Sequence, residues 1–548
     1  MENSRSNTRK TKIIIICAVL LFSSVIAFWT LSEKPLNNHE CFVSITAREM
    51  LQSGDWIMPT YNGEPRLQKT PLSYWLVAGL AKVTGKVDEF TTRLPSAVFG
   101  ILSVAAILYF VNQWLSFRIA ILSAAVWATS LGYVRYSHNA RPEMVLTFFI
   151  MLCFLTFYSA VSTNNRKRQI IYMLVFWISF GLANLAKGPA PLPLVLVPLF
   201  FYVAVFRRWK QIPKLLPIIG TVIFLAIILP WPLAIASKLN WNLAVWKREF
   251  VDRFFGTYAS GGKPLYYYLP KMFQFMLPWA AFVPFALTAP FYRVWNKKQP
   301  VMQFLWLWFV VGVAFLTISS GKRQHYIIPM MPAMAILTAV LIEDMAFCRK
   351  AYTNKSARNF LFSHLVVLTI GFVALPIIIS KVKSEFLTEA ILSSAAGLIG
   401  ILIVAVLFRA GKTSVACWAL FVIIAVLVMI SYTGFVNPSH YNQPSRKFSQ
   451  SVSQIVPASD KLIAYKSASG RFIHYFGRRV PKIGTKSEVN ELYKKGWWVV
   501  AFGIYLDELQ DGNSFEIVFI QENAERHRNK VVGGALLHKS GGDPENNI

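Results

Sequence analysis

The run IIIICAVLLFSSVIAFWTLS, residues 13–32, decides the class of fold that this sequence adopts. Wound as an α-helix, roughly 20 apolar residues span the hydrocarbon core of a bilayer. The basic residues Arg9, Lys10 and Lys12 precede the run, and a basic start followed by apolar residues also describes a secretory signal peptide. However, no small-residue cleavage site follows, and many similar runs come later in the chain. We therefore expect a retained membrane anchor.

The composition indicates that the membrane association extends along the whole chain of 548 residues. Hydrophobic residues make up 55% and charged residues 15%, and a soluble domain needs more polar surface than this to cover itself. The formal net charge of +30 is scattered among short loops, which favours the basic bias of cytoplasmic loops over a nucleic-acid-binding face. Anionic ligands are a second explanation for the excess of cations. The five cysteines show neither paired nor metal-type spacing.

Since a transmembrane helix needs roughly 20 apolar residues, the sequence predicts about thirteen transmembrane helices. The runs fall near residues 13–32, 93–114, 118–135, 143–162, 169–186, 189–206, 214–237, 269–291, 301–319, 326–346, 360–380, 387–408 and 413–434. Every second connection, from Arg118 to Lys412, is rich in Lys and Arg and almost free of acids. The positive-inside rule therefore places the N-terminus in the cytoplasm, and an odd number of spans leaves the C-terminus outside. The prediction is therefore a multi-pass membrane protein with a cytoplasmic N-terminus and a C-terminal segment on the outer side.

Two long connections, at about 33–92 and about 238–268, lie on the predicted outer side together with a tail from about residue 436. In the first connection, FVSITAREMLQSG has apolar residues at helical spacing and ends at Gly54. PLSYWLVAGLAKVTG is also apolar, with a Tyr–Trp pair near one end, and aromatic rings prefer the membrane–water boundary. We expect both segments to form interfacial helices.

The tail has the pattern of a soluble domain. Segments with strand-like patterns alternate with segments with helix-like patterns. The strand-like segments are KLIAYK at 461–466, WWVVAF at 497–502 and FEIVFIQ at 515–521, and the helix-like segments are GRFIHYF at 470–476 and KSEVNELYKK at 486–495. This alternation predicts a small α/β domain of about 100 residues. The predicted organisation is therefore an all-α polytopic membrane domain, 1–435, followed by a soluble α/β domain, 436–548.

Ionisable residues gather at or just beyond the outer ends of the predicted spans. Such residues are costly at membrane depth and usually mark a functional site. Because five separate outer connections supply them, topology brings them to one face of the membrane. The set comprises His39, Glu40, Lys69, Arg141, Glu143, Lys187, Glu249, Asp252, Arg253, Lys322, Arg323 and Tyr326.

Each member also has a structural explanation. Glu40 fits an ordinary loop acid or a partner in a helix N-cap, and Glu143 opens a span, where an acid complements the helix dipole. Lys187 and Lys322 fit cations that snorkel to the interface. Tyr326 fits the interfacial aromatic belt. The isolated histidines make metal ligation improbable.

Carboxylates together with cations point to a transfer reaction. A carboxylate takes the proton from an acceptor hydroxyl, while Lys and Arg offset the charge of a phosphate leaving group. A lipid-borne phosphate enters from the bilayer, where these cations lie. The pattern predicts sugar transfer from a polyprenyl-phosphate donor to a lipid, glycan or protein hydroxyl.

Two other classes of function are alternatives. A transporter or flippase for a lipid-linked sugar predicts ionisable groups near the middle of spans and an inverted repeat, and the sequence shows neither. An assembly protein whose outer domain binds partners is the third alternative.

Several segments of the sequence resemble the family 39 type of bacterial membrane glycosyltransferases. These enzymes are related to the protein O-mannosyltransferases and the aminoarabinose lipid A transferase. The resemblance covers roughly residues 10–440 and implies a GT-C fold. The segments are HECFVSITAREMLQSGDWIMPTYNGEPRLQKTPLSYWL at 39–76, ARPEMVLTFF at 140–149, LAKGP at 185–189, EFVDRF and YYYLP within 249–270, and SGKRQHYIIP at 320–329.

The resemblance also implies roles for individual residues. The family's catalytic acid falls on His39, and the following Glu falls on Glu40, which we expect to be the base or to orient the acceptor. Glu143 matches the second acidic position. Lys69 matches a lysine that meets the donor phosphate. The remaining implied donor contacts are Arg253, Lys322 and Tyr326.

The resemblance implies no zinc site. Where the lipid A transferase has a Glu and a His that hold a metal, this chain has Gln68 and Phe250. A divalent ion elsewhere is left open, and no other cofactor is implied. Phe42, which stands where the family has an Arg after the acid pair, leaves the acceptor open.

Overall fold

The computed structural model describes residues 2–240, 244–247, 263–291, 298–319, 321–348, 354–382, 384–435, 444–511, 515–527 and 530–539. The chain divides into two compact units. Unit 1 comprises 1–31, 67–73 and 93–435. Unit 2 comprises 32–66, 74–92 and 436–548.

In the described residues, ten helices are long and apolar enough to cross a membrane. By element they are α1 (Glu2–Phe28), α4 (Glu89–Trp114), α7 (Glu143–Ser162), α8 (Arg166–Lys187), α10 with α11 (Pro217–Ile228 and Pro230–Lys238), α16 (Gln299–Ile318), η7 with α17 (Gln324–Met330 and Met331–Glu343), α18 (Asn354–Val382), α19 (Leu387–Arg409) and α20 (Thr413–Phe435). The pair α5 (Phe117–Thr129) and α6 (Leu131–Ser137), bent by 60°, makes an eleventh if it crosses as one span.

The difference from the predicted thirteen spans lies in two runs that form shorter helices. The run at 189–206 becomes α9 (Pro191–Val205), and the run at 269–291 contains the short apolar helix Trp279–Phe291. A proline lies at the start of each helix, where its missing backbone N–H does not interrupt the helical hydrogen bonds. Pro191 is the first residue of α9, and Pro278 directly precedes the second helix.

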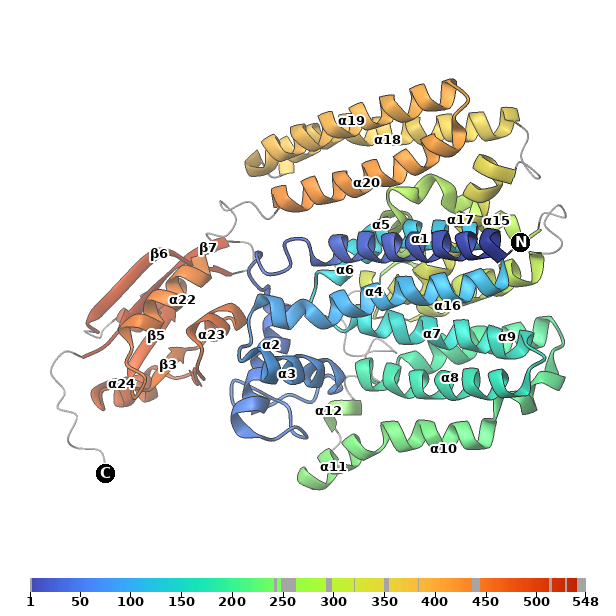
Figure 1. The fold of residues 1–548 in the computed structure, drawn as a ribbon. Helices are drawn as coiled ribbons and strands as arrows, with labels where there is room; N and C mark the ends of the chain where they lie inside the picture. Colours follow the sequence, from blue (N-terminus) through green and yellow to red (C-terminus); the bar gives the residue numbers. More distant parts are fainter. Residues whose placement is uncertain are drawn as a thin grey trace. The chain divides into compact units, whose positions relative to one another are not determined.

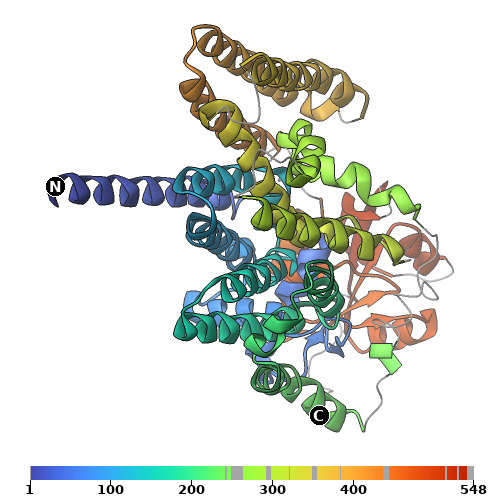
Figure 2. The ribbon, with the colours of Figure 1, turned by 90° about the vertical axis from the view of Figure 1, so that its right-hand side faces the viewer.

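Unit 1 is built from antiparallel helix neighbours (Figure 1). A short turn with Asn165 as N-cap joins α7 to α8, and the layer formed by α18, α19 and α20 stays together in a view at right angles (Figures 1 and 2). Helix α10 approaches α8 so closely that a Cβ on Gly220 would lie 1.9 Å from Nε1 of Trp177. Aromatic stacking fills the centre, with the rings of Phe154 and Trp308 4.5 Å apart.

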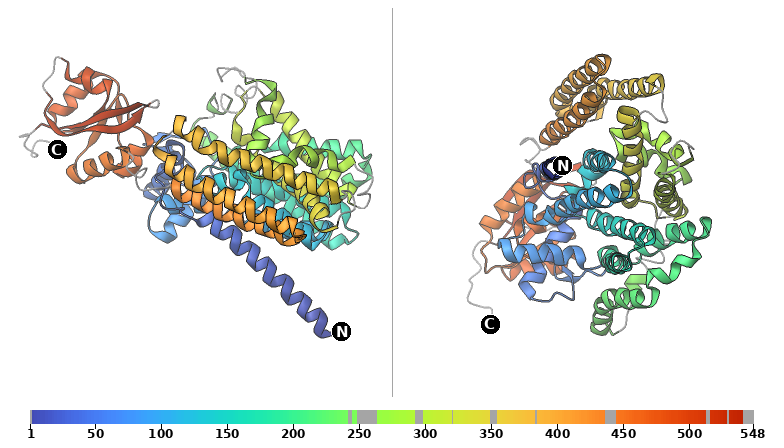
Figure 3. Two further views of the ribbon diagram at one scale, coloured as in Figure 1. Left: turned by 90° about the horizontal axis from the view of Figure 1, so that it is seen from above. Right: turned by 45° about the vertical axis from the view of Figure 1, so that its right-hand side comes forward.

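Unit 2 is an α/β unit whose sheet is drawn in red tones in Figure 3. The strand order of this sheet is β4-β3-β5-β7-β6. The strands are β3 (Leu462–Tyr465), β4 (Lys482–Ile483), β5 (Trp498–Phe502), β6 (Ile517–His527) and β7 (Lys530–Leu537). Strand β3 pairs in parallel with β4 and β5, whereas β7 pairs antiparallel with β5 and β6. The helices are α22 (Pro444–Ile455), α23 (Gly470–Phe476), α24 (Lys486–Lys494) and α25 (Ile504–Gln510).

Most of the first long connection, residues 32–66 and 74–92, belongs to the same unit as this sheet. It forms α2 (Asn38–Ser53), the hairpin β1–β2 (Thr60–Tyr61 and Glu64–Pro65) and α3 (Leu72–Thr84). Leu36, Cys41 and Ile45 are buried in one apolar core with Phe448 and Phe472 of the tail. Because burial of apolar surface drives folding, the connection and the tail stabilise each other. The predicted domain boundary at residue 435 separated these two segments, which the structure groups in one unit.

Candidate active site

Glu143 and Lys187 form a buried ion pair in unit 1. Glu143 is the first residue of α7, and Lys187 is the last residue of α8. Because the two helices are antiparallel, these residues meet at the same end of the pair. The Lys187 Nζ lies 2.9 Å from Glu143 Oε1, and only 10% and 4% of the two side chains is exposed. A charged contact that is this short and this well shielded from solvent holds both groups in one geometry.

His325 and Tyr326 complete the cluster from a segment far along the chain. The His325 Nε2 lies 3.4 Å from Glu143 Oε1. The Lys187 ammonium lies 4.7 Å from the centre of the Tyr326 ring, within the range of a cation–π attraction. Lys187 is therefore placed between a carboxylate and an aromatic face. His325 was not among the predicted site residues, since its neighbours in the sequence gave no ligand spacing.

The segment that carries Lys69 contacts the end of α8. The Gly188 N–H donates to Thr70 Oγ1 over 3.0 Å. Gly188 has φ 68° and ψ −151°, a conformation that is essentially restricted to glycine. Because Lys69 and Lys187 each precede one partner of this hydrogen bond, their backbones are held near each other.

Lys322 lies in a second tethered segment. Its Nζ donates to the Lys263 carbonyl over 3.2 Å, and the residue is 8% exposed. The Tyr268 hydroxyl donates to the Arg323 carbonyl over 3.2 Å, and the Tyr326 N–H donates to the same carbonyl over 3.0 Å. These hydrogen bonds fix the turn that presents Tyr326 to Lys187.

Two buried polar atoms of this site have no hydrogen-bond partner among the described residues. They are Oε2 of Glu143 and Nε of Arg141. The Arg141 backbone is itself held, since its N–H donates to Asn139 Oδ1 over 3.1 Å and its carbonyl accepts from the Ser96 hydroxyl over 3.4 Å. Unsatisfied buried polar atoms are rare in folded proteins, and here an acceptor and a donor lie two residues apart.

Glu40 and His39 belong to unit 2. The Asn37 N–H and Nδ2 both donate to Glu40 Oε2, over 2.9 and 2.6 Å, while Asn37 Oδ1 accepts from the backbone N–H of Glu40. This is a capping box that begins α2, so the predicted structural explanation of Glu40 holds. His39 is exposed. The catalytic role of these two residues stays a prediction.

The start of α2 is anchored to the tail. The Tyr475 hydroxyl accepts from the Leu36 N–H and donates to Glu89 Oε1, each over 2.9 Å. Arg446 lies 3.5 Å from the same carboxylate oxygen. Because Leu36 directly precedes the capping box, the tail fixes the turn that carries His39 and Glu40.

Several of the remaining predicted residues lie outside the described part of the chain. Arg253 lies outside the described residues, together with Glu249, Asp252 and Phe250. The side-chain oxygen of Gln68 is buried without a hydrogen-bond partner in the described part of the chain. Within that part, no three His, Cys, Asp or Glu side chains gather in a way that would hold a metal ion.

A protein-family model matches residues 17–240, and its description is dolichyl-phosphate-mannose-protein mannosyltransferase. Over these residues the chain is similar to this family. The predicted resemblance is confirmed, and the stretch that matches contains the Glu143–Lys187 pair and Thr70.

Curated relatives are similar over more than half of the chain. An undecaprenyl phosphate-alpha-4-amino-4-deoxy-L-arabinose arabinosyl transferase from Pseudomonas paraeruginosa is 28% identical over 323 residues, which is 57% of this chain and 58% of the relative. An uncharacterized protein from Aquifex aeolicus is 30% identical over 340 residues, 61% of this chain and 64% of the relative. The chain thus spans less than two thirds of the length of these two relatives.

A solved structure agrees with the fold of nearly the whole chain. It is ArnT from Cupriavidus metallidurans bound to undecaprenyl phosphate, with a TM-score of 0.80, 20% identity, and coverage of 96% of this chain and 97% of that chain. The predicted GT-C fold, a helical multi-pass membrane protein with a small sheet at its C-terminal end, is confirmed.

Proposed function

We propose that the protein is an inverting glycosyltransferase that moves a sugar from a polyprenyl-phosphate donor to an acceptor hydroxyl at the outer face of the bacterial inner membrane. The N-terminus is then cytoplasmic and the C-terminal segment periplasmic. The observation that carries the proposal is the Lys187 ammonium, which is held between Glu143 and the Tyr326 ring at the end of a membrane helix. A fixed cation at that depth suits a phosphate that arrives on a lipid.

In this reaction the acceptor oxygen forms a bond to the anomeric carbon while the bond from that carbon to the phosphate oxygen breaks. The electron pair leaves with the lipid phosphate, whose charge is offset by Lys187 together with Lys69, Lys322 and the predicted contact Arg253. The hydroxyl proton passes to a carboxylate, and the sequence pattern assigns this role to Glu40. Stabilising the charge that develops on a leaving group is commonly a large catalytic effect.

Glu143 has a second role in the proposal. Its Oε1 is engaged by Lys187 and lies near His325, so the carboxylate orients the two groups that face the phosphate. Its Oε2, which lacks a described donor, is available to accept a hydrogen bond from a sugar hydroxyl. Arg141 Nε, also without a described partner, is available as a donor to the phosphate.

The comparisons support the class of donor. The family description names a dolichyl-phosphate sugar, and the Pseudomonas paraeruginosa relative is named for an undecaprenyl-phosphate sugar. Both are sugars on long polyprenyl phosphates. We keep the sugar and the acceptor (a lipid, glycan or protein hydroxyl) open within this class.

The test is release of free undecaprenyl phosphate from an undecaprenyl-phosphate sugar by the purified protein, with and without acceptor. We expect release to depend on acceptor and to fall about 100-fold in Lys187→Met, the loss typical of one charge-stabilising donor. A Lys187→Met variant that retained full turnover at an unchanged fold would contradict the proposal.

Glu40 allows a sharper comparison because Gln also completes a capping box. We expect Glu40→Gln to keep the thermal stability of the wild type and to lose at least about 100-fold in turnover. Glu40→Ala loses both the cap and the base. Glu64→Gln, an exposed acid of the same connection, serves as the matched control, and full turnover in Glu40→Gln would remove the proposed base.

A further inference from the structure

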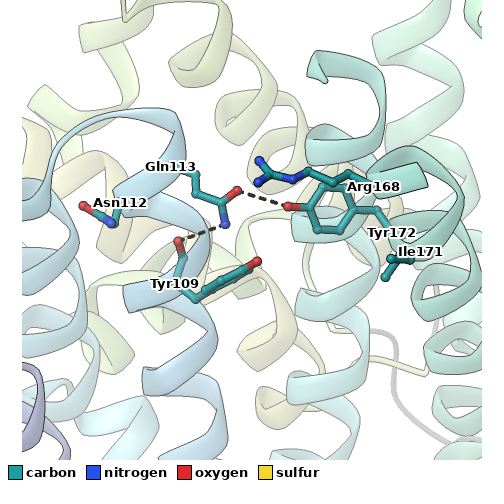
Figure 4. Close-up of a pocket in the computed structure, with 6 residues that line it drawn as sticks. All are labelled: Tyr109, Asn112, Gln113, Arg168, Ile171 and Tyr172. Atoms are coloured by element: carbon teal, nitrogen blue, oxygen red, sulfur yellow. Dashed lines mark hydrogen bonds between the residues drawn. The ribbon is translucent and has the colours of Figure 1, made fainter. Parts of the chain in front are cut away.

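A pocket of about 370 Å³ lies in unit 1 between the last turns of α4 and the first turns of α8. Figure 4 shows the six residues that line it: Tyr109, Asn112, Gln113, Arg168, Ile171 and Tyr172. None of them belongs to the candidate active site.

The pocket lies at the opposite end of α8 from the ion pair. Arg168 is in the first turn of α8, and Lys187 is its last residue. At a rise of 1.5 Å per residue, the two are about 28 Å apart along the helix, which is about the thickness of the hydrocarbon core. The pocket is therefore at the other membrane–water interface.

Its polar side is preorganised. The Tyr172 hydroxyl donates to Gln113 Oε1 over 3.0 Å, and Gln113 Nε2 donates to the Tyr109 carbonyl over 3.4 Å. The Arg168 N–H donates to the N-cap Asn165, so the backbone that carries this guanidinium is fixed. Among the described residues, the Arg168 guanidinium has no ion pair and donates no hydrogen bond.

Its other side is apolar and faces outward. Tyr109 and Ile171 are each 57% exposed, although both lie on helices that are apolar enough to cross a membrane. A cation and amides next to exposed apolar side chains match a molecule that has a charged head and a hydrocarbon tail. Basic pockets between membrane helices commonly bind anionic lipid head groups.

We propose that this pocket binds the phosphate head group of an anionic phospholipid from the leaflet at the N-terminal end of α8. Arg168 pairs with the phosphate, and Asn112 with Gln113 donates to its remaining oxygens. The acyl chains lie along Tyr109 and Ile171. The site is independent of the sugar-transfer proposal.

The adjacent basic residues provide a matched control. Lys167 is exposed and does not line the pocket. Arg166 is engaged elsewhere, since its Nη1 donates to Gln169 Oε1 over 2.8 Å. Arg168→Gln and Lys167→Gln thus remove the same charge from neighbouring positions, but only the first removes a group from the pocket.

The experiment titrates the full-length protein, purified in a neutral detergent, with phosphatidylglycerol and counts bound lipids by native mass spectrometry. We expect one saturable site that Arg168→Gln weakens about 10-fold, the loss of one charge-assisted contact, and that Lys167→Gln changes less than about 2-fold. Phosphatidylcholine, which has the same phosphate but no net charge, should bind far more weakly.

Three results would overturn the inference. Equal losses in Arg168→Gln and Lys167→Gln would mean that diffuse positive charge attracts the lipid. Equal binding of phosphatidylcholine would mean that the head-group charge is not recognised. Competition by inorganic phosphate at the same concentration as phosphatidylglycerol would mean that the pocket takes a free anion and not a lipid.

Discussion

The buried ion pair between Glu143 and Lys187 predicts a large loss of stability when only one partner is removed. In Lys187→Met, the Glu143 carboxylate, whose side chain is 4% exposed, loses the ammonium that lies 2.9 Å away. Breaking a buried pair in this way costs about 3–5 kcal/mol. Because His325 still lies 3.4 Å from the same oxygen, we expect the lower end, about 3 kcal/mol.

The double variant separates charge from packing. In Glu143→Gln with Lys187→Met, no unpaired carboxylate is left, so we expect about 2 kcal/mol of the loss to return, within the usual range of coupling between contacting residues. Turnover should stay low in the double variant, since the cation is still absent. The double variant should therefore regain stability without regaining activity.

Thermal unfolding in detergent, followed by tryptophan fluorescence, measures both variants. For a unit of this size, about 3 kcal/mol corresponds to a midpoint shift of several degrees. The control is Lys86→Met, which breaks a pair at 2.8 Å whose side chains are 71% and 28% exposed. Solvent screens such a pair, and we expect no measurable shift. If Lys187→Met unfolds at the same midpoint as Lys86→Met, or if the double variant shows no recovery, the reasoning from burial is wrong.

Three further predictions concern single residues. Gly188→Ala forces a side chain into a glycine conformation (φ 68°, ψ −151°), so we expect a loss of about 1–3 kcal/mol together with reduced turnover; a variant like the wild type in both assays would contradict this. Tyr475→Phe removes the hydroxyl that donates to Glu89 and should lower stability by about 1–3 kcal/mol, which an unchanged melting midpoint would refute. Burial first, and then the charge of Arg48, lowers the pKa of His474 from 6.5 to about 3. The unfolded chain therefore binds a proton below about pH 6.5 that the folded chain does not, and stability should fall by up to about 1.4 kcal/mol per pH unit as the pH decreases from 6.5 towards 3. In His474→Asn the free energy of unfolding should depend less steeply on pH, by the slope that corresponds to one proton. Equal slopes in the wild type and the variant would rule out this contribution.

Local features of the fold were predictable because they depend on neighbours in the sequence. Apart from the runs at 189–206 and 269–291, the apolar runs match helices of the described residues that are long enough to span a membrane, since hydrocarbon thickness sets the length of a span. Gly54 ends α2 with φ 71°, a conformation that favours glycine. In the tail, the predicted β3, β5, α23 and α24 are all present. Strand β7 was missed because its two glycines weaken strand propensity.

Tertiary contacts decided the rest. His325 meets Glu143 across a long stretch of chain, and no local pattern marks it. The sequence left Glu40 with two explanations, and the contact with Asn37 supplies the structural one.

The sequence by itself determined that this is a multi-pass helical membrane protein and that its Lys187 and Glu143 lie at span ends, because hydrophobicity and helix length act locally along the chain. Only the tertiary structure decided that these two residues form one pair, that His325 and Tyr326 join them, and that the outer connection shares a core with the tail. The physical reason is that buried charges and apolar surfaces choose their partners by proximity in space, which depends on the packing of the whole unit.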